Sequence, residues 1–223
     1  MSKSPAEKSR ILIVDDHPLF RQGLQQMIDD NPETVVCGQA ADAAQALQAI
    51  PELKPDLVLV DISLAGTSGI DLIKSIRDQY EDLPVLVVSM HDESLYAERA
   101  LRAGAMGYVM KHEPGRTVET AIATVLNGDI YVSPRMSTSM LAKFTRGKRD
   151  EPSSALHKLS DRELEVFRMM GQGKGTRQIA EELNLTIATI NSFRAHIKEK
   201  LQLKSSTEVM LHAIQENRDA AGT

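Results

Sequence analysis

The stretch Ile11-Leu12-Ile13-Val14-Asp15-Asp16 decides the fold, because four aliphatic residues run directly into two carboxylates. Three later runs repeat this pattern, each ending at a polar residue: 57–60 before Asp61, 85–88 before Ser89 and 107–110 before Lys111. Short runs that are rich in Val, Ile and Leu are typical of buried parallel strands. The chain is therefore predicted to build a parallel sheet with polar residues at its strand ends.

The polar residues at these strand ends predict a single site. In an open parallel sheet, ligands bind beyond the carboxyl ends of the strands, so three carboxylates, a hydroxyl and an ammonium should converge there. Any one of these aspartates alone would be read as a turn or cap residue. Carboxylates placed together repel one another unless a cation compensates, and their hard oxygens suit Mg²⁺. The constellation indicates a divalent cation beside a phosphorylated aspartate.

The first half of the chain alternates strands with amphipathic segments. Strands are predicted at 10–15, 34–40, 56–61, 84–89 and 106–110, with helix-like periodicity between and after them. Five such units predict an α/β fold, a doubly wound five-stranded parallel sheet with helices on both faces. We assign residues 1–127 to this domain.

Residues 128–156 are predicted to be a linker with one short helix over 135–144. The linker contains a basic run, Lys143-Phe144-Thr145-Arg146-Gly147-Lys148-Arg149. A solvated linker is the simpler interpretation of this run. Phosphate contact or docking on the acidic domain is the alternative.

Residues 157–223 are predicted to form a small all-α domain of four helices. Ser160 and Glu163 have the spacing of a capping box at the start of the first helix. A short turn at 184–186 separates the second helix from a third at about 186–201, which is the helix-turn-helix pattern. A small protein-interaction bundle is the alternative interpretation of four short helices.

Charge and composition bound the partners and the compartment. The net charge is −5, but residues 1–130 hold 11 Lys and Arg against 20 Asp and Glu, a net of −9, and residues 156–223 hold 10 against 9, a net of +1. This asymmetry predicts different partners for the two halves. No apolar stretch approaches the roughly 20 residues of a membrane span. The single Cys37 cannot form an internal disulfide, so a cytoplasmic protein without a membrane partner is expected.

Residues 11–24 carry a resemblance to a known family. Val14-Asp15-Asp16-His17-Pro18-Leu19-Phe20-Arg21 resembles the opening of a two-component receiver domain of the NarL/FixJ (LuxR-type) response regulators, a CheY/flavodoxin-like fold. Residues 56–64, 88–91 and 104–111 are similar to the remaining receiver motifs. One departure is Leu64-Ala65-Gly66, where the family usually has Met-Pro-Gly.

The resemblance implies roles for individual residues. Asp61 would be the phosphoacceptor, and Mg²⁺ would be bound by Asp15, Asp16, Asp61 and the backbone carbonyl of Ser63. The phosphoryl group would be sensed by Ser89, Lys111 and Tyr108. The donor would be a sensor histidine kinase or a small acyl phosphate, and the phosphorylated form would be a homodimer.

Residues 157–217 are similar to LuxR-type DNA-binding domains, so double-stranded operator DNA is the expected partner, with RNA polymerase as a further one. The expected DNA contacts lie on or near the recognition helix: Thr176, Arg177, Ala188, Thr189, Asn191, Ser192, Arg194, Ala195, Lys198 and Lys204. Asn191 stands where many relatives have Lys. Because Asn pairs with adenine and Lys with guanine, a different operator is predicted.

The sequence therefore predicts a DNA-binding transcriptional response regulator rather than an enzyme, activated by Mg²⁺-dependent phosphorylation of Asp61. Two other classes remain open at this point. One is a receiver that docks on another protein without phosphorylation, and the other is a hydrolase that uses the carboxylate cluster on a small phosphoester.

Overall fold

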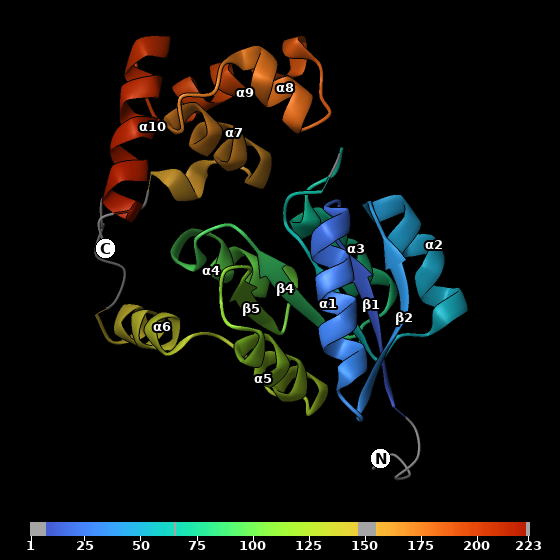
Figure 1. The fold of residues 1–223 in the computed structure, drawn as a ribbon. Coiled ribbons are helices and arrows are strands. Elements are labelled where there is room, and N and C mark those ends of the chain that lie inside the picture. Colours follow the sequence, from blue (N-terminus) through green and yellow to red (C-terminus); the bar gives the residue numbers. More distant parts are fainter. Residues whose placement is uncertain (1–7, 65, 147–154, 222–223) are drawn as a thin grey trace. The chain divides into compact units, whose positions relative to one another are not determined.

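The computed structural model describes residues 8–64, 66–146 and 155–221, which divide into two compact units at 144/145. The first unit is built on a five-stranded sheet in the order β2-β1-β3-β4-β5, with all neighbours parallel (Figure 1). The strands are β1 Ser9–Val14, β2 Thr34–Ala40, β3 Leu57–Val60, β4 Val85–Ser89 and β5 Gly107–Met110. Each predicted strand is present, with bounds that shift by one residue or less, and the doubly wound fold is confirmed.

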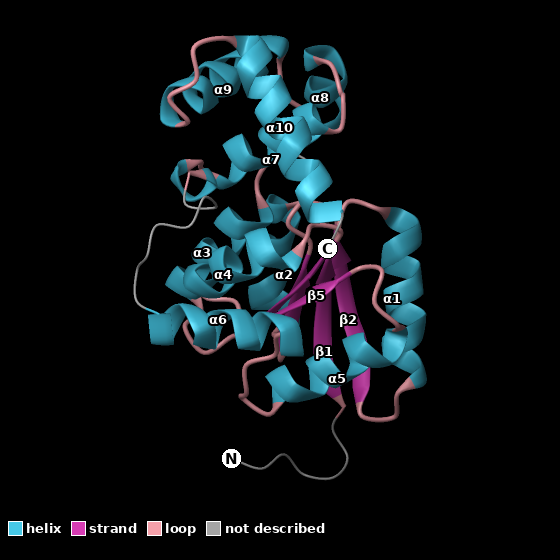
Figure 2. Cartoon of the chain, turned by 90° about the vertical axis from the view of Figure 1, so that its left-hand side faces the viewer, coloured by secondary structure: helices cyan, strands magenta, loops and turns pink. Residues whose placement is uncertain are grey.

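Helices cover both faces of this sheet (Figure 2). They are α1 Pro18–Asp30, α2 Ala43–Leu53, α3 Gly69–Gln79, α4 Glu93–Ala103 and α5 Gly115–Leu126. Alternate residues of β1, β3 and β4 pack with α1 and α5 in one hydrophobic core, which includes Ile13, Leu59 and Val88. The intervening residues of the same strands, such as Leu12 and Val58, are also fully buried, beneath α2, α3 and α4. Burial on both faces explains why these strands read as continuous aliphatic runs.

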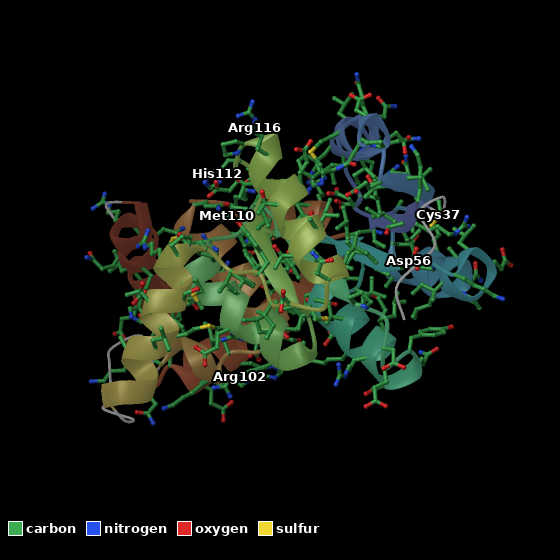
Figure 3. All side chains as sticks on the ribbon, turned by 90° about the horizontal axis from the view of Figure 1, so that it is seen from below. Cys37, Asp56, Arg102, Met110, His112 and Arg116 are labelled. Atoms are coloured by element: carbon green, nitrogen blue, oxygen red, sulfur yellow. The ribbon has the colours of Figure 1, made fainter. Side chains whose placement is uncertain are left out.

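The chain beyond α5 continues along the edge of the sheet. Tyr131 forms a parallel bridge with Gly107 of β5, and α6 (Pro134–Arg146) follows directly. Met136 of α6 is buried, so the start of this helix is packed against the first unit. At the opposite edge, Cys37 lies half-buried on β2 (Figure 3).

The second unit is helical throughout its described residues. It comprises the short 3₁₀ turn η2 (Leu156–Lys158) and the helices α7 Asp161–Gly171, α8 Thr176–Glu182, α9 Ile187–Lys200 and α10 Ser206–Ala221. Its core is formed by residues from all four helices, including Phe167, Ile179, Ile190, Ile197 and Val209.

Caps and turns set the helix boundaries in this second unit. Ser160 and Glu163 form the predicted capping box, with Ser160 N donating to Glu163 Oε2 at 2.7 Å and Glu163 N donating to Ser160 Oγ at 3.3 Å. Thr186 caps α9 by accepting from Thr189 N at 3.1 Å. Asn184 turns the chain between α8 and α9 with a φ of +52°, a left-handed conformation that Asn tolerates better than most residues. The helix-turn-helix arrangement is thereby confirmed.

Candidate functional site

The carboxyl ends of β1, β3 and β5 bring the predicted acidic cluster together. Asp15 and Asp61 are almost fully buried, with side chains 3% and 2% exposed. The ammonium of Lys111 lies between them, with Nζ 2.6 Å from Asp15 Oδ2 and 2.7 Å from Asp61 Oδ2. The side chain of Lys111 is itself only 4% exposed, so this ion pair is shielded from solvent. One buried ammonium thus offsets part of the charge of two buried carboxylates.

Burial changes the acidity of Asp61. The pKa of its carboxyl is raised to about 6, chiefly because burial disfavours the charged form. The negative charge of Asp15 adds to the rise, whereas Lys111 opposes it through its charge and its hydrogen bond. Above that pKa the carboxyl is ionised and can act as an oxygen nucleophile. It is largely shielded from water, and the Lys111 ammonium partly neutralises its charge.

Asp16 completes a set of donors that fits a divalent cation. Ligand atoms of Asp15, Asp16, His17 and Asp61 lie within 4.8 Å of one another. Oδ1 of Asp16 is buried and accepts no hydrogen bond, although it lies 2.7 Å from His17 Nδ1 in ion-pair geometry. A buried carboxylate oxygen without a hydrogen bond is a ready ligand for a hard cation, so the residues present fit Mg²⁺.

The loop after β3 also approaches this cluster. Ser63 N donates to Asp61 Oδ1 at 3.3 Å, which places the Ser63 backbone beside the carboxyl. Ala65, at the departure from the usual family sequence, lies outside the described residues. Gly69, the first residue of α3, packs so closely that an added Cβ would lie 2.0 Å from the Asp61 carbonyl oxygen. Glycine is therefore required here for α3 to start against the site.

Ser89 and Tyr108 are linked through a residue that sequence reasoning did not single out, His91. The backbone N of His91 donates to Ser89 Oγ at 3.3 Å, and its carbonyl accepts from the Tyr108 hydroxyl at 2.8 Å. Its ring stacks on Tyr96 with centroids 4.5 Å apart, and its Nε2 lies 2.7 Å from Ser63 Oγ. Its position two residues after Ser89 was the available signal, but spacing alone does not show this set of contacts.

Phe20 is a second contributor that the sequence pattern did not indicate. The ammonium of Lys111 lies 4.4 Å from the centroid of the Phe20 ring, a cation–π contact. The Arg21 guanidinium donates to the backbone carbonyl of Asp15, which fixes the first turn of α1 against the end of β1. These contacts join residues of different strands and helices, so no local periodicity predicts them.

The ten residues predicted to contact DNA are all accessible to solvent, exposed or half-buried. Seven of them lie on α9: Ala188, Thr189, Asn191, Ser192, Arg194, Ala195 and Lys198. Ile190 and Ile197 of the same helix are fully buried, so α9 presents its polar side outward. Lys204 lies outside α9, in the turn that precedes α10.

The structure joins two of these residues directly. Arg194 of α9 donates to Thr176 Oγ1 of α8 at 2.7 Å, which fastens the recognition helix to the start of α8. Arg177 instead pairs with Glu181 along α8, with Nε 3.0 Å from Oε1. The Arg194–Thr176 bond therefore brings the start of α8 beside α9, while Lys204 lies apart in the turn before α10.

Comparison with known proteins assigns both units. Residues 11–123 match the response regulator receiver domain, and residues 157–213 match the bacterial regulatory proteins of the luxR family. The oxygen regulatory protein NreC of Staphylococcus carnosus (strain TM300) is 32% identical over 210 residues, which cover 92% of this chain and 97% of that protein.

Solved structures agree with this assignment. A LuxR-family two-component response regulator from Aurantimonas sp. SI85-9A1 is 34% identical, with a TM-score of 0.59 over 62% of this chain and 99% of that one. RcsB from Salmonella enterica serovar Typhimurium, bound to the promoter rprA in the presence of the phosphomimetic BeF₃⁻, shares the fold at 23% identity, with a TM-score of 0.62 over 93% and 98% of the two chains.

A receiver followed by a helix-turn-helix domain defines a two-component regulator of transcription that binds DNA. The chain belongs to the NarL/FixJ (LuxR-type) family of response regulators. This family consists of transcription regulators and not of enzymes, so the hydrolase interpretation is set aside. Among the described residues, no helix combines the length and the apolar character that crossing a bilayer requires.

Proposed function

We propose that this regulator is switched by phosphorylation of Asp61. The observation that carries the proposal is the buried Asp61 carboxyl at the end of β3, with the Lys111 ammonium 2.7 Å from its Oδ2. A hydrolase or a structural ion pair would not require a helix-turn-helix domain on the same chain. A phosphorylation switch does require such a domain, because the change at the receiver must be converted into a change in DNA binding.

In the proposed step, an Oδ atom of Asp61 attacks the phosphorus of the donor in line. The new O–P bond forms as the bond to the leaving group breaks, and the leaving group takes the electron pair. The donor is a phosphohistidine of a sensor histidine kinase or a small acyl phosphate. Lys111 sits within reach of the transferred group and offsets the charge that the product adds, nearly two negative charges.

Mg²⁺ would be held by Asp15, Asp16, Asp61 and the Ser63 carbonyl, and would supply charge neutralisation and alignment of the phosphoryl oxygens. The Asp16 Oδ1 atom, which is buried and has only the neighbouring His17 ring beside it, supports this ligand set. Positioning of Asp61 and exclusion of water are provided by the protein's own residues. Asp15 and Lys111 hold Asp61 in place by their mutual ion pair, and the burial of all three excludes water from the reacting carboxylate.

Ser89 and Tyr108 are proposed to sense the product. Ser89 is fully buried at the end of β4, and its Oγ accepts from His91 N. In the phosphorylated state the Ser89 hydroxyl would donate to a phosphoryl oxygen, and Tyr108 would follow because its hydroxyl donates to the His91 carbonyl. The surface of α4, β5 and α5 would change most, which is how a local charge becomes a binding signal.

The output is proposed to be binding of double-stranded operator DNA through α9. Asn191 would read bases in the major groove, and Thr176, Arg177, Thr189, Lys198 and Lys204 would contact phosphates. Two phosphorylated copies would bind two half-sites about one helical turn apart. The solved RcsB–promoter complex, formed with a phosphomimetic, supports this arrangement for a protein of the same fold. RNA polymerase is a further proposed partner at the promoter.

The proposal is tested by phosphoryl uptake from acetyl phosphate and Mg²⁺, comparing the wild type with Asp61→Asn. We expect phosphorylation of the wild type and none of the variant, with tighter DNA binding only in the phosphorylated wild type. Asp56→Asn, at the other end of β3, is a matched control that should retain uptake. Full uptake by Asp61→Asn would refute the assignment, and equal DNA affinity with and without phosphate would favour a phosphorylation-independent interaction module.

Sequencing of genomic fragments captured by the phosphorylated and unphosphorylated protein would define the operator. We expect enrichment that depends on phosphorylation and an adenine at the position that Asn191 reads. Enrichment of the same fragments without phosphate would contradict the proposed switch.

A further inference from the structure

The segment between α5 and α6 is fixed to the edge of the sheet by backbone hydrogen bonds. Tyr131 N donates to the Met106 carbonyl at 2.9 Å, and Tyr108 N donates to the Tyr131 carbonyl at 3.0 Å. The Tyr131 side chain packs against the hydrophobic core between the sheet and α5. Tyr131 therefore anchors this segment to β5 and to the core.

Ser133 begins the linker helix α6 and also bonds to α4. Its Oγ accepts from Met136 N at 3.0 Å, which caps α6, and its hydroxyl donates to Glu93 Oε1 at 2.6 Å. Glu93 is 8% exposed, and among the described residues no Lys, Arg or His forms an ion pair with it. The bond is short and joins a nearly buried carboxylate to the residue that caps the linker helix. Such a charge-assisted bond tolerates little displacement.

Glu93 is also the first residue of α4, so it follows closely on the residues that are proposed to sense phosphate. Its chain neighbour two positions earlier, His91, donates its backbone N–H to Ser89 Oγ and accepts from the Tyr108 hydroxyl. If Ser89 Oγ moves toward a phosphoryl group, it moves away from the His91 N–H, which then loses its acceptor. The loop 90–92 and the start of α4 would then adjust, while Tyr131, two residues before Ser133, would stay bonded to Met106 and Tyr108.

We propose that the Glu93–Ser133 hydrogen bond couples the phosphorylation state of Asp61 to the linker helix α6. The coupling rests on the proposed function, because it needs the phosphoryl group to draw Ser89 away from His91. In the unphosphorylated protein the bond holds the cap of α6 in place. Phosphorylation shifts Glu93 relative to Ser133, breaks the bond and loosens the first turn of the helix that leads to the DNA-binding unit.

The test is hydrogen–deuterium exchange of the full-length protein, read by mass spectrometry in peptides that cover the first turns of α6. It compares the wild type, Glu93→Ala and Glu93→Asp, each with and without acetyl phosphate and Mg²⁺. Phosphoryl uptake at Asp61 is measured on the same samples. Glu98→Gln is the matched control, since Glu98 lies on the same helix and pairs instead with the exposed Arg102 at 2.8 Å.

For the wild type and Glu98→Gln, phosphorylation should speed exchange at the start of α6 about fivefold, the effect of a weakened helix cap. Glu93→Ala and Glu93→Asp should show the faster rate before phosphorylation and no further change after it, because neither side chain reaches Ser133. The Glu93→Asp variant keeps the charge at the start of α4, so it separates loss of the bond from loss of the charge.

Two results would overturn the inference while leaving the proposed function intact. One is confirmed uptake at Asp61 with unchanged exchange in α6 of the wild type. The other is a Glu93→Ala variant that is phosphorylated and still shows the wild-type change in α6. If the wild type takes up no phosphate at all, the proposed function fails and the coupling fails with it.

Discussion

Replacement of Asp61 by Asn should stabilise the receiver unit at neutral pH when no metal is present. Keeping a carboxyl ionised when its pKa is about 6 instead of 3.8 costs about 3 kcal/mol, at roughly 1.36 kcal/mol per pKa unit. Asn has nearly the same shape and carries no charge, so the variant avoids this cost. Lys111 keeps its other partner, because its Nζ lies 2.6 Å from Asp15 Oδ2. The pKa of about 6 already includes the opposing attraction of Lys111, so this figure is the net cost of keeping the carboxyl ionised.

The stability that Asp61→Asn gains over the wild type should increase with pH. Between pH 3.8 and 6 the native state binds more protons at Asp61 than the unfolded state does, so wild-type stability falls as pH rises through this window. The advantage of Asp61→Asn should therefore be about 3 kcal/mol at pH 7.5 and only about 1 kcal/mol at pH 4.5. Addition of Mg²⁺ should narrow the gap at pH 7.5, because the cation binds the wild type more tightly.

The chain offers a clean assay for this unit. All four tyrosines, Tyr80, Tyr96, Tyr108 and Tyr131, lie within residues 1–144, and the chain has no tryptophan. Urea unfolding followed by tyrosine fluorescence in the presence of EDTA thus reports on the receiver unit alone. A variant that is no more stable than the wild type at pH 7.5, or whose advantage does not shrink at pH 4.5, would refute the reasoning.

Four further substitutions test other parts of the structure. Gly69→Ala should destabilise the receiver unit by about 1–3 kcal/mol, because its Cβ would lie 2.0 Å from the Asp61 carbonyl oxygen. The same urea titration measures this loss of stability. Unchanged stability would show that the backbone at this site can relax. Ser160→Ala should lower the stability of the second unit by about 1 kcal/mol through loss of the capping box, seen by circular dichroism with no change in tyrosine fluorescence. Asn191→Ala should relax base preference without altering the salt dependence of operator binding, whereas Lys198→Ala should weaken binding to all sequences and reduce the salt slope by about one. The reverse pattern in a fluorescence-anisotropy salt series would contradict the placement of Asn191 at the bases.

Local patterns in the sequence predicted the sheet and the residues at its strand ends, because burial on both faces leaves a continuous aliphatic run in each strand. The capping box at Ser160 was predictable for a similar reason, since its two partners are three positions apart. Contacts between positions that are far apart in the sequence could not be predicted. The bond from Ser133 to Glu93 spans 40 positions, and the cation–π contact of Phe20 with Lys111 joins α1 to the end of β5. Periodic patterns in the sequence do not predict contacts of this kind.

The Lys111 ammonium is a resident counterion, and an incoming cation would compete with it for Asp15 and Asp61. It already bridges Asp15 and Asp61, so the resting site is partly neutralised and gains less from binding a metal than three free carboxylates would. A phosphoryl group on Asp61 would offer the ammonium a new partner and would release Asp15. By reciprocity, phosphorylation should then raise metal affinity by the same factor by which the metal favours phosphorylation. Lys111 would thereby make Mg²⁺ binding and phosphorylation of Asp61 cooperative, each one favouring the other.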